Sequence, residues 1–349
     1  MKVLVIQQKM IGDVLASTVI CEALKMEYPH VEIHYMIHHN TKPVIDNNPF
    51  IDHIIQFDPQ KIKGLRSLRR FGKSLMPLNF DAVIDAYGKW ESVIPAYFSG
   101  APIRIGFSKW YTDIFYTKSV IQKPCVEGSA IFHRLQLAEA FIGKFPPIVF
   151  PKIFLGDSEI SQARENLDKI RGNSKVIMIS VLGSDVQKSL PPMQMAAMLD
   201  HVVASGNVIL LFNFIPVQKE AARAIYDLCM PETKKQIVFD FYMKGLRPFL
   251  AVMSQCDALV GNEGGAVNMA KALGIPTFTL FSPWINKSSW NMLTSDGVHV
   301  AIHLQDYFPE LYGAHHPGAF KNKSGAFYKK LTLRLYQDSL TDFLQKIIL

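Results

Sequence analysis

Three polar loops hold the residues of this sequence that are best suited to chemistry. The first is Gln7–Asp13, in which Asp13 stands at the start of an expected helix. In one interpretation the Asp13 carboxylate caps that helix. In the other it is a general base that takes a proton from an attacking hydroxyl group. Both interpretations stay open on the residues alone.

The second loop joins small residues to a cation. Gly183 and Ser184 precede Lys188 in the stretch LGSDVQKS, which follows an expected strand. Small residues let a phosphate approach the backbone, and the Lys188 ammonium can neutralise negative charge that develops on a leaving group. The alternative is a solvated lysine in an ordinary loop.

The third loop is a glycine turn inside 257–283, DALVGNEGGAVNMAKALGIPTFTLFSP, which is typical of strand, turn, helix and strand. Gly264 and Gly265 let a ligand approach the backbone. The helix that follows presents unpaired N–H groups and a positive dipole end, which suits a phosphate or a sugar hydroxyl. Glu263 either caps this helix or accepts hydrogen bonds from ligand hydroxyls. A plain strand–turn–helix unit capped by Glu263 is the alternative.

A basic segment, KIKGLRSLRRFGK at 61–73, is a fourth feature. Its cations are either a solvated helix face or a contact for a phosphorylated lipid or an acidic sugar. The aromatic segment FSKWYTDIFY at 107–116 either touches acyl chains at a membrane surface or packs at a domain edge. The candidate acceptor-binding residues are Lys61, Lys63, Arg66, Arg69 and Arg70.

The elements that must position these loops alternate between strand and helix. We expect strands at 2–6, 31–37, 53–57 and 80–85, and a second series at 175–181, 207–213, 236–240, 258–260 and 277–281. Such alternation predicts βαβ units and parallel sheets with helices on both faces, and hence an α/β protein. Ligands of open parallel sheets bind beyond the carboxyl ends of the strands, where all three loops fall.

We expect two Rossmann-like domains that face a central cleft. The first covers 1–150 and the second 158–326, joined by a proline-containing linker near 146–158. A helical segment at 327–349 ends the chain, with packing back on the N-terminal domain as an option. Residues 101–128 are expected to be irregular, and 305–326 to be loop.

Composition excludes several function classes. The chain has 349 residues, of which 49% are hydrophobic and 19% charged, so it can build sizeable cores. We expect no signal peptide and no spanning helix, and the four scattered cysteines favour a reducing cytoplasm. A net charge of +7 favours anionic ligands, whereas the absence of a basic stripe interleaved with aromatics argues against nucleic acid.

The loops together fit a transferase whose cleft closes over a nucleotide-sugar. One domain supplies a carboxylate, and the other supplies a lysine and a glycine turn. No Asp-x-Asp cluster stands on a loop suited to a metal, so we expect Lys188 and backbone amides to stabilise the leaving group without a metal ion.

Several pieces of the chain, in order, resemble the heptosyltransferase-like glycosyltransferases of family 9. KVLVIQQKMIGDVLAS is similar to the opening of the family, FDAVIDAYG to a buried strand that ends in Asp, and RIGF at 104–107 to another recurrent piece, as is the helix that begins at His133. Lys188-Ser189-Leu190-Pro191 resembles a Lys-x-Trp-Pro loop. GNEGGAVNMAKA resembles an Asp-Ser/Thr-Gly-x-x-His-x-Ala-x-Ala segment.

This resemblance implies a GT-B fold and inverting, metal-independent transfer of a sugar, heptose or related, from an ADP-linked donor to lipopolysaccharide core or another cell-surface glycan. It also implies that Asp13 is the catalytic base and that Lys188 binds the donor phosphate. The full expected donor-binding set is Gly183, Ser184, Lys188, Glu263, Gly264, Gly265 and Asn268. No cofactor is expected, and the acceptor is expected to be an anionic glycolipid at the cytoplasmic face of the inner membrane.

Four positions depart from the family pattern. Glu263 replaces Asp, Asn268 replaces His, Leu190 replaces Trp, and Gln7 replaces a frequent Arg. The first two lie where a donor sugar would bind, so they bear on which sugar is used. Two alternative functions therefore stay open: a nucleotide-sugar epimerase of similar architecture, and a non-catalytic binding member of the family.

Overall fold

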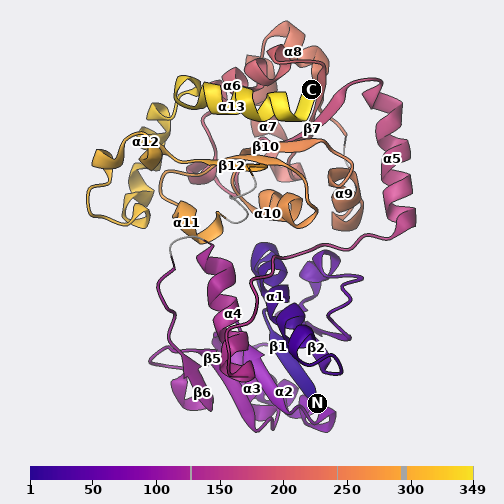
Figure 1. The fold of residues 1–349 in the computed structure, drawn as a ribbon, viewed down its shortest axis with the longest axis vertical. Helices are drawn as coiled ribbons and strands as arrows, with labels where there is room; N and C mark the ends of the chain where they lie inside the picture. The colour runs from indigo at the N-terminus through magenta and orange to yellow at the C-terminus, as the bar shows by residue number, and fades with distance from the viewer. Residues whose placement is uncertain (126–127, 242, 292–296, 349) are drawn as a thin grey trace. The chain divides into compact units, whose positions relative to one another are not determined.

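The computed structural model describes residues 1–125, 128–241, 243–291 and 297–348. The chain forms two compact units, Met1–Phe154 and Leu155–Leu349. Each unit is built on one six-stranded sheet with helices packed around it (Figure 1). The boundary between the units falls inside the linker region expected from the sequence.

The N-terminal unit has the strand order β3-β2-β1-β4-β5-β6, and all its neighbouring strands are parallel. Apolar side chains of β1 are buried on both faces of the sheet, as parallel sheets require. The strands are β1 (Lys2–Ile6), β2 (Glu32–His38), β3 (His53–Phe57), β4 (Ala82–Asp85), β5 (Ile103–Phe107) and β6 (Lys118–Val120).

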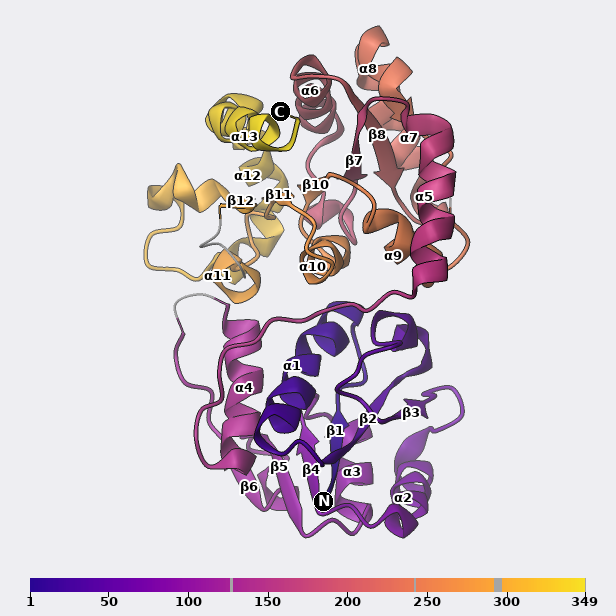
Figure 2. The same ribbon diagram turned by 45° about the vertical axis from the view of Figure 1, so that its right-hand side comes forward.

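Two pairs of helices cover this sheet. Helices α1 (Ile11–Glu27) and α4 (Ser129–Ile142) pack against each other, as do α2 (Gly64–Leu75) and α3 (Trp90–Phe98). Figure 2 shows α1 and α4 in front of the strands and α3 behind them. Within 101–128, expected to be less regular than the rest of the unit, the chain forms β5 and the three-residue β6.

The C-terminal unit repeats the pattern with the order β12-β11-β10-β7-β8-β9, again parallel throughout. Its strands are β7 (Lys175–Ser180), β8 (Val208–Asn213), β9 (Ile237–Val238), β10 (Ala258–Asn262), β11 (Thr277–Leu280) and β12 (His299–Ile302). Its helices are α5 (Asp157–Arg171), α6 (Pro192–Ala204), α7 (Lys219–Leu228), α8 (Pro231–Gln236), α9 (Leu246–Met253), α10 (Gly265–Ala272), α11 (Lys287–Trp290), α12 (Ser324–Lys330) and α13 (Leu333–Ile348).

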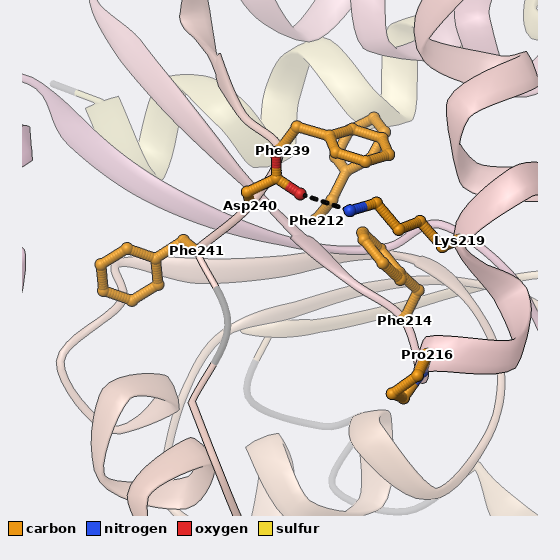
Figure 3. A pocket seen from close by; sticks show the side chains of 7 residues that line it. All are labelled: Phe212, Phe214, Pro216, Lys219, Phe239, Asp240 and Phe241. Carbon is orange, nitrogen blue, oxygen red and sulfur yellow. Dashed lines mark ion pairs between the residues drawn. The ribbon is translucent and has the colours of Figure 1, made fainter.

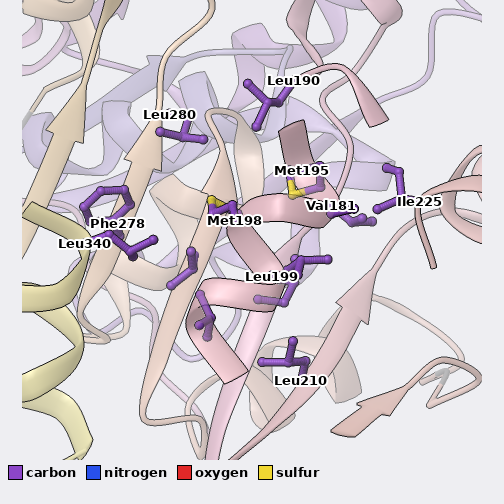
Figure 4. Close-up of a cluster of buried hydrophobic side chains, with 14 of the residues drawn as sticks. Val181, Leu190, Met195, Met198, Leu199, Leu210, Ile225, Phe278, Leu280 and Leu340 are labelled. Carbon is purple, nitrogen blue, oxygen red and sulfur yellow. The ribbon is translucent and has the colours of Figure 1, made fainter. Parts of the chain in front are cut away.

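The last helix belongs to the core of the C-terminal unit. Leu340, Phe343 and Leu344 of α13 are buried in the same cluster as Met198 of α6 (Figure 4), and the Phe343 ring lies 5.6 Å from that of Phe278 on β11. The apolar face of this helix completes the sheet–helix core of its own unit. The option that the segment packs back on the N-terminal domain stays a prediction.

One further difference concerns a polar segment. The stretch 305–326, expected to be loop, contains the 3-10 turns Pro309–Leu311 and Pro317–Lys323 and the start of α12. Within the described part of the chain, no helix has both the length and the apolar character needed to cross a bilayer.

Candidate functional site

Asp13 is the third residue of α1, directly after the loop that follows β1. Its Oδ2 accepts a hydrogen bond from the backbone N–H of Met10 at 3.3 Å, which is the helix-capping contact. Its Oδ1 accepts from Nη2 of Arg134 at 2.7 Å. One third of the side chain is exposed. The carboxylate therefore caps its helix and remains open to solvent, so the two interpretations of Asp13 are compatible.

Arg134 fixes the direction of that carboxylate. Its Nε donates to Ser17 Oγ at 2.7 Å and its Nη1 to the carbonyl oxygen of Ala130, so the guanidinium is held at three points. Because Ser17 lies one helical turn after Asp13, Arg134 of α4 contacts side chains from the first two turns of α1. We did not single out Arg134 from the sequence. The available signal was a lone arginine on the helix face that buries Ile131 and other apolar residues.

In the C-terminal unit, Asn262 joins the loop of Lys188 to the strand that leads into the glycine turn. Asn262 ends β10 and is fully buried. Its Oδ1 accepts from the backbone N–H of Leu190 at 2.7 Å, and its Nδ2 donates to the carbonyl oxygens of Ser180 and Val181, each at 3.0 Å. The loop after β7 is thus tied to the strand that leads into the glycine turn, so the two segments keep a fixed spacing.

The loop that carries Lys188 is tightly folded around Gly183. A Cβ atom at Gly183 would lie 2.3 Å from the carbonyl oxygen of Lys188, so only glycine fits there. The Gly183 N–H donates to Ser189 Oγ at 2.9 Å, and Gln218 Nε2 donates to the Gly183 carbonyl at 2.8 Å. Ser184, next in sequence, is exposed. The loop therefore presents a rigid backbone from which the Lys188 side chain extends.

Lys188 lies beside a tryptophan that the sequence did not point to. Its Nζ is 5.5 Å from the centre of the Trp284 ring, and Lys321 Nζ is 5.0 Å from the same ring. Trp284 Nε1 and Ser282 Oγ both donate to the carbonyl oxygen of Gln187, which anchors the indole to the lysine loop. Two cations gathered at one ring make this part of the unit suited to a polyanion such as a diphosphate.

Glu263 places a carboxylate beside Lys188 in this region. It is half-buried, and among the described residues its buried Oε1 has no hydrogen-bond partner. Burial raises the pKa of Glu263, while the charge of Lys188 lowers it and that of Asp185 raises it further. An unpartnered buried carboxylate oxygen is costly, so it is a natural acceptor for a ligand hydroxyl.

The glycine turn after Glu263 leaves open space. Gly264 has φ +153°, and a Cβ atom at Gly264 or Gly265 would meet no described atom within 4 Å. Gly265 begins α10, so the first backbone N–H groups of that helix have no partner within the helix. Asn268 is half-buried in the first turn of α10. The turn thus leaves room for a ligand beside its backbone, and ligand binding there stays a prediction.

An aromatic pocket follows β8 and β9 in the same sheet. Its cavity is about 280 Å³ and is lined by Phe212, Phe214, Pro216, Lys219, Phe239, Asp240 and Phe241 (Figure 3). Lys219 and Asp240 form an ion pair of 3.1 Å at its margin. We did not expect this pocket. Its signal in the sequence was the alternation of phenylalanines in FNF at 212–214 and FDF at 239–241.

The basic segment forms an exposed face of the N-terminal unit. Leu68, Gly72 and Leu75 of α2 are buried, so the helix turns its cations outward. Arg69 stacks on the ring of Phe98 at 5.1 Å, and Lys61 pairs with Asp58 at 3.8 Å. All five expected acceptor-binding residues are exposed: Lys61, Lys63, Arg66, Arg69 and Arg70. Their exposure is equally suited to solvent and to an anionic ligand.

Comparison with known proteins identifies the family. The model of glycosyltransferase family 9 (heptosyltransferase) matches residues 68–307, more than half of the chain. This chain belongs to glycosyltransferase family 9. A curated relative, lipopolysaccharide heptosyltransferase 1 of Campylobacter coli, is 26% identical over 294 residues, which are 80% of this chain and 84% of the relative.

Solved structures agree on the fold. The family 9 glycosyltransferase of Veillonella parvula superposes with a TM-score of 0.78 at 19% identity, covering 99% of this chain and 97% of its own. The Escherichia coli heptosyltransferase WaaC, solved with ADP-2-deoxy-2-fluoro heptose, gives a TM-score of 0.65 at 14% identity, covering 86% and 93%. The predicted fold class, a GT-B arrangement of two Rossmann-like domains, is confirmed, as is the assignment to a glycosyltransferase.

The family 9 fold brings most of the predicted residues into two groups. Lys188 lies close enough to Glu263 for its charge to act on the pKa of that carboxyl, and the two residues stand on the segments that Asn262 joins. Gly264, Gly265 and Asn268 follow Glu263 directly. Asp13 belongs to the other unit, with Arg134 as its partner. The roles of these residues in donor binding and catalysis remain predictions.

Proposed function

We propose that this family 9 enzyme transfers heptose or a related sugar from a nucleotide-diphosphate donor, with ADP-linked donors favoured, to lipopolysaccharide core or another cell-surface glycan. The observation that carries the proposal is the unpartnered Oε1 of Glu263 beside an open glycine turn, within electrostatic reach of Lys188. A cation and N–H groups suit the diphosphate, and a carboxylate suits sugar hydroxyls. The named functions of the C. coli and E. coli relatives support the same donor class.

The proposed reaction is a direct displacement. Asp13 takes the proton of the acceptor hydroxyl as its oxygen attacks the anomeric carbon. The bond between that carbon and the donor phosphate oxygen breaks, and its electron pair leaves with the nucleotide diphosphate. Attack opposite the leaving group inverts the anomeric centre. Lys188 and the amides at Gly264 and Gly265 stabilise the departing charge without a metal ion.

Arg134 has a positioning role in this proposal. Two of its three donor groups are held by Ser17 and Ala130, so the third presents a fixed contact to Asp13 Oδ1. The exposed side of the Asp13 carboxylate is thereby aimed in one direction. A base held in this way loses little freedom when the acceptor binds.

The aromatic pocket is the proposed place for the nucleobase. Phenylalanine rings such as Phe214 and Phe239 offer flat apolar faces, and the cavity of about 280 Å³ lies at the carboxyl ends of β8 and β9, on the same sheet edge as the glycine turn. The size fits one part of a ligand rather than a whole nucleotide-sugar. The Lys219–Asp240 pair at its margin suits ribose hydroxyls.

The departures at Glu263 and Asn268 bear on the sugar. Glu263 keeps a carboxylate but reaches one methylene further than Asp, and Asn268 keeps hydrogen bonding without a titratable ring. Glu263 directly precedes the glycine turn and Asn268 follows it, so they fit a donor sugar whose hydroxyls differ from those of the usual heptose. A hexose or a different heptose is therefore included in the proposal.

The acceptor is proposed to be an anionic glycolipid, met at the cytoplasmic face of the inner membrane. The exposed cations of 61–70 support an anionic partner. Trp110 and Ile114, which are 92% and 82% exposed, support peripheral contact with a lipid surface. Reversing the charges of Arg66, Arg69 and Arg70 should raise the acceptor KM and leave donor affinity unchanged. Unchanged acceptor kinetics would indicate that these residues form a solvated helix face and do not bind the acceptor.

The main experiment combines a donor panel with a matched pair of variants. ADP-, GDP-, UDP- and CDP-linked sugars are tested for binding by thermal shift and then for transfer. Asp13→Asn should lower kcat by about 10²–10⁴-fold, the usual value of a general base, and leave donor binding intact. Glu139→Gln is the control, because Glu139 is also partly exposed and paired, with Lys123 at 3.3 Å.

The outcomes distinguish the three functions that the sequence left open: a transferase, an epimerase and a non-catalytic binding protein. Transfer that depends on Asp13 but not on Glu139 supports the transferase. Conversion of the donor sugar without any acceptor would instead indicate an epimerase. Donor binding without transfer or hydrolysis on any acceptor would indicate a binding protein. Near-normal turnover of Asp13→Asn would overturn the assignment of the base.

A further inference from the structure

Three potential metal ligands meet at an edge of the N-terminal sheet, outside every loop discussed above. Glu32 and His34 are two residues apart on β2, so they share one face of the sheet. His53 begins the edge strand β3 and is the register partner of His34. One ligand atom from each of the three residues lies within 4.8 Å of the others.

The distances within this cluster suit a common ion. His34 Nε2 lies 2.8 Å and His53 Nε2 3.4 Å from Oε1 of Glu32, and the two imidazole centres are 4.5 Å apart. Ligand atoms that each lie about 2.0–2.2 Å from a tetrahedral zinc ion are roughly 3.3–3.5 Å from one another. The His53–Glu32 separation already has this value. The shorter contact is a hydrogen bond that an ion would replace with a small shift of one side chain.

The surroundings hold the ligands in place and leave a way in. His34 is buried and packs edge-on against the Phe80 ring, with 5.0 Å between the ring centres. Glu32 and His53 are partly exposed, so solvent reaches the cluster from one side. All three residues stand on paired strands rather than on loops, and strands keep ligand positions precise.

We propose that Glu32, His34 and His53 bind a first-row transition-metal ion, with Zn²⁺ as the reference ion. Two imidazole nitrogens and one carboxylate oxygen form a ligand set that zinc accepts, with water in the fourth position. Ca²⁺ and Mg²⁺ prefer oxygen ligands and are poorly served by this set.

The site would lie apart from the proposed transfer chemistry. Glu32 and His53 begin their strands, whereas Asp13 follows the carboxyl end of β1, so in this parallel sheet they lie at opposite ends. A bound ion would join the edge strand β3 to β2. The proposed transfer reaction therefore keeps its metal-independent chemistry whether or not this site is filled, and the two proposals can fail separately.

Lys2 provides a further test of the proposed site, because its side chain contacts one of the three ligands. Its Nζ lies 3.6 Å from Oε1 of Glu32, so it competes with a metal ion for the same carboxylate oxygen. Removing the cation in Lys2→Gln should strengthen zinc binding. Removing a ligand in His53→Ala or Glu32→Gln should weaken it.

The test is a titration of the chelator-treated full chain with ZnCl₂, followed by calorimetry and by thermal unfolding. We expect a single high-affinity equivalent that raises the melting temperature. His53→Ala should lower its affinity at least about 100-fold, since even outer-shell changes cost 10–100-fold. His53 is half exposed, so this variant removes little core packing. His30→Ala is the control, because His30 is exposed and lies just before β2.

Several results of the zinc titration would contradict the proposal. Zinc binding that is the same in the wild type, His53→Ala and Glu32→Gln would place the ion elsewhere and overturn the proposal, as would the absence of a one-to-one equivalent. Weaker binding in Lys2→Gln would contradict the competition. Loss of binding in His30→Ala to the same extent as in His53→Ala would also refute the assignment.

Discussion

Replacing Asn262 tests whether this one side chain holds the loop of Lys188 to the strand that leads into the glycine turn. Asn262→Ala removes three hydrogen bonds, one from Leu190 N–H and two to the carbonyls of Ser180 and Val181. Each bond contributes about 1 kcal/mol net, and a buried group left unpaired costs about 1–3 kcal/mol. The free energy of unfolding of the C-terminal unit should fall by about 3 kcal/mol or more.

Asn262→Asp separates the two halves of the contact. An aspartate of the same shape can still accept from Leu190 N–H, but an ionised carboxylate cannot donate to the two carbonyl oxygens and places charge beside them. It should therefore destabilise the unit at neutral pH at least as much as Asn262→Ala. The control is Asn207→Ala: Asn207 also makes two side-chain hydrogen bonds but is exposed.

The assay is urea unfolding followed by tryptophan fluorescence. Trp90 and Trp110 are first replaced by phenylalanine, so that Trp284 and Trp290 report only on the C-terminal unit. A loss of 3 kcal/mol should lower the urea midpoint by about 1 M or more. Donor affinity should fall as well, because the loop of Lys188 loses its anchor. A midpoint for Asn262→Asp equal to that of the wild type, or an equal loss in Asn207→Ala, would refute the reasoning.

Two further predictions concern the same unit. Because burial raises the pKa of Glu263 above its ordinary 4.5, the stability that this group contributes is full below pH 4.5 and is lost as pH rises through the higher folded value. Glu263→Gln should therefore gain stability relative to the wild type as pH rises from 4.5 to neutral, measured as urea midpoints along that series; a constant difference would contradict this. Gly183→Ala should distort the lysine loop and weaken donor binding at least about tenfold, because its Cβ would lie 2.3 Å from the Lys188 carbonyl, whereas Gly325→Ala, where nothing lies within 4 Å, should leave donor binding unchanged. Equal donor affinity in the two glycine variants would count against the close contact.

The sequence predicted the sheets where apolar runs are bounded by polar turns. Strands Lys2–Ile6 and His53–Phe57 lie where they were expected, because their patterns are strong and local. The pairing of β5 and β6 was missed for a reason that lies in tertiary packing. A Cβ at Gly106 would lie 2.2 Å from the Tyr116 ring, whose hydroxyl donates to buried Asp85 at 2.8 Å. Nothing in IRIGF signals that partner.

The candidate site divides in the same way. Asp13, Lys188 and the glycine turn were found because small or charged residues follow expected strands. Arg134 and Trp284 were not found, because each acts through partners about a hundred positions away in sequence, such as Asp13 and Gln187. Local patterns carry no information on such contacts. The aromatic pocket was missed for the same reason, since its rings come from two separate strand ends.

The short outer strands of the two sheets bear on self-association. Strand β9 pairs over two residues and β6 over three, and β6 begins with the exposed Lys118. An unpaired strand edge is a template for another chain, and natural proteins limit that risk with short edges and lysines. These edges offer too little backbone to nucleate intermolecular sheet growth. A parallel α/β protein with strongly hydrophobic inner strands is thereby protected from aggregation at one outer strand of each sheet.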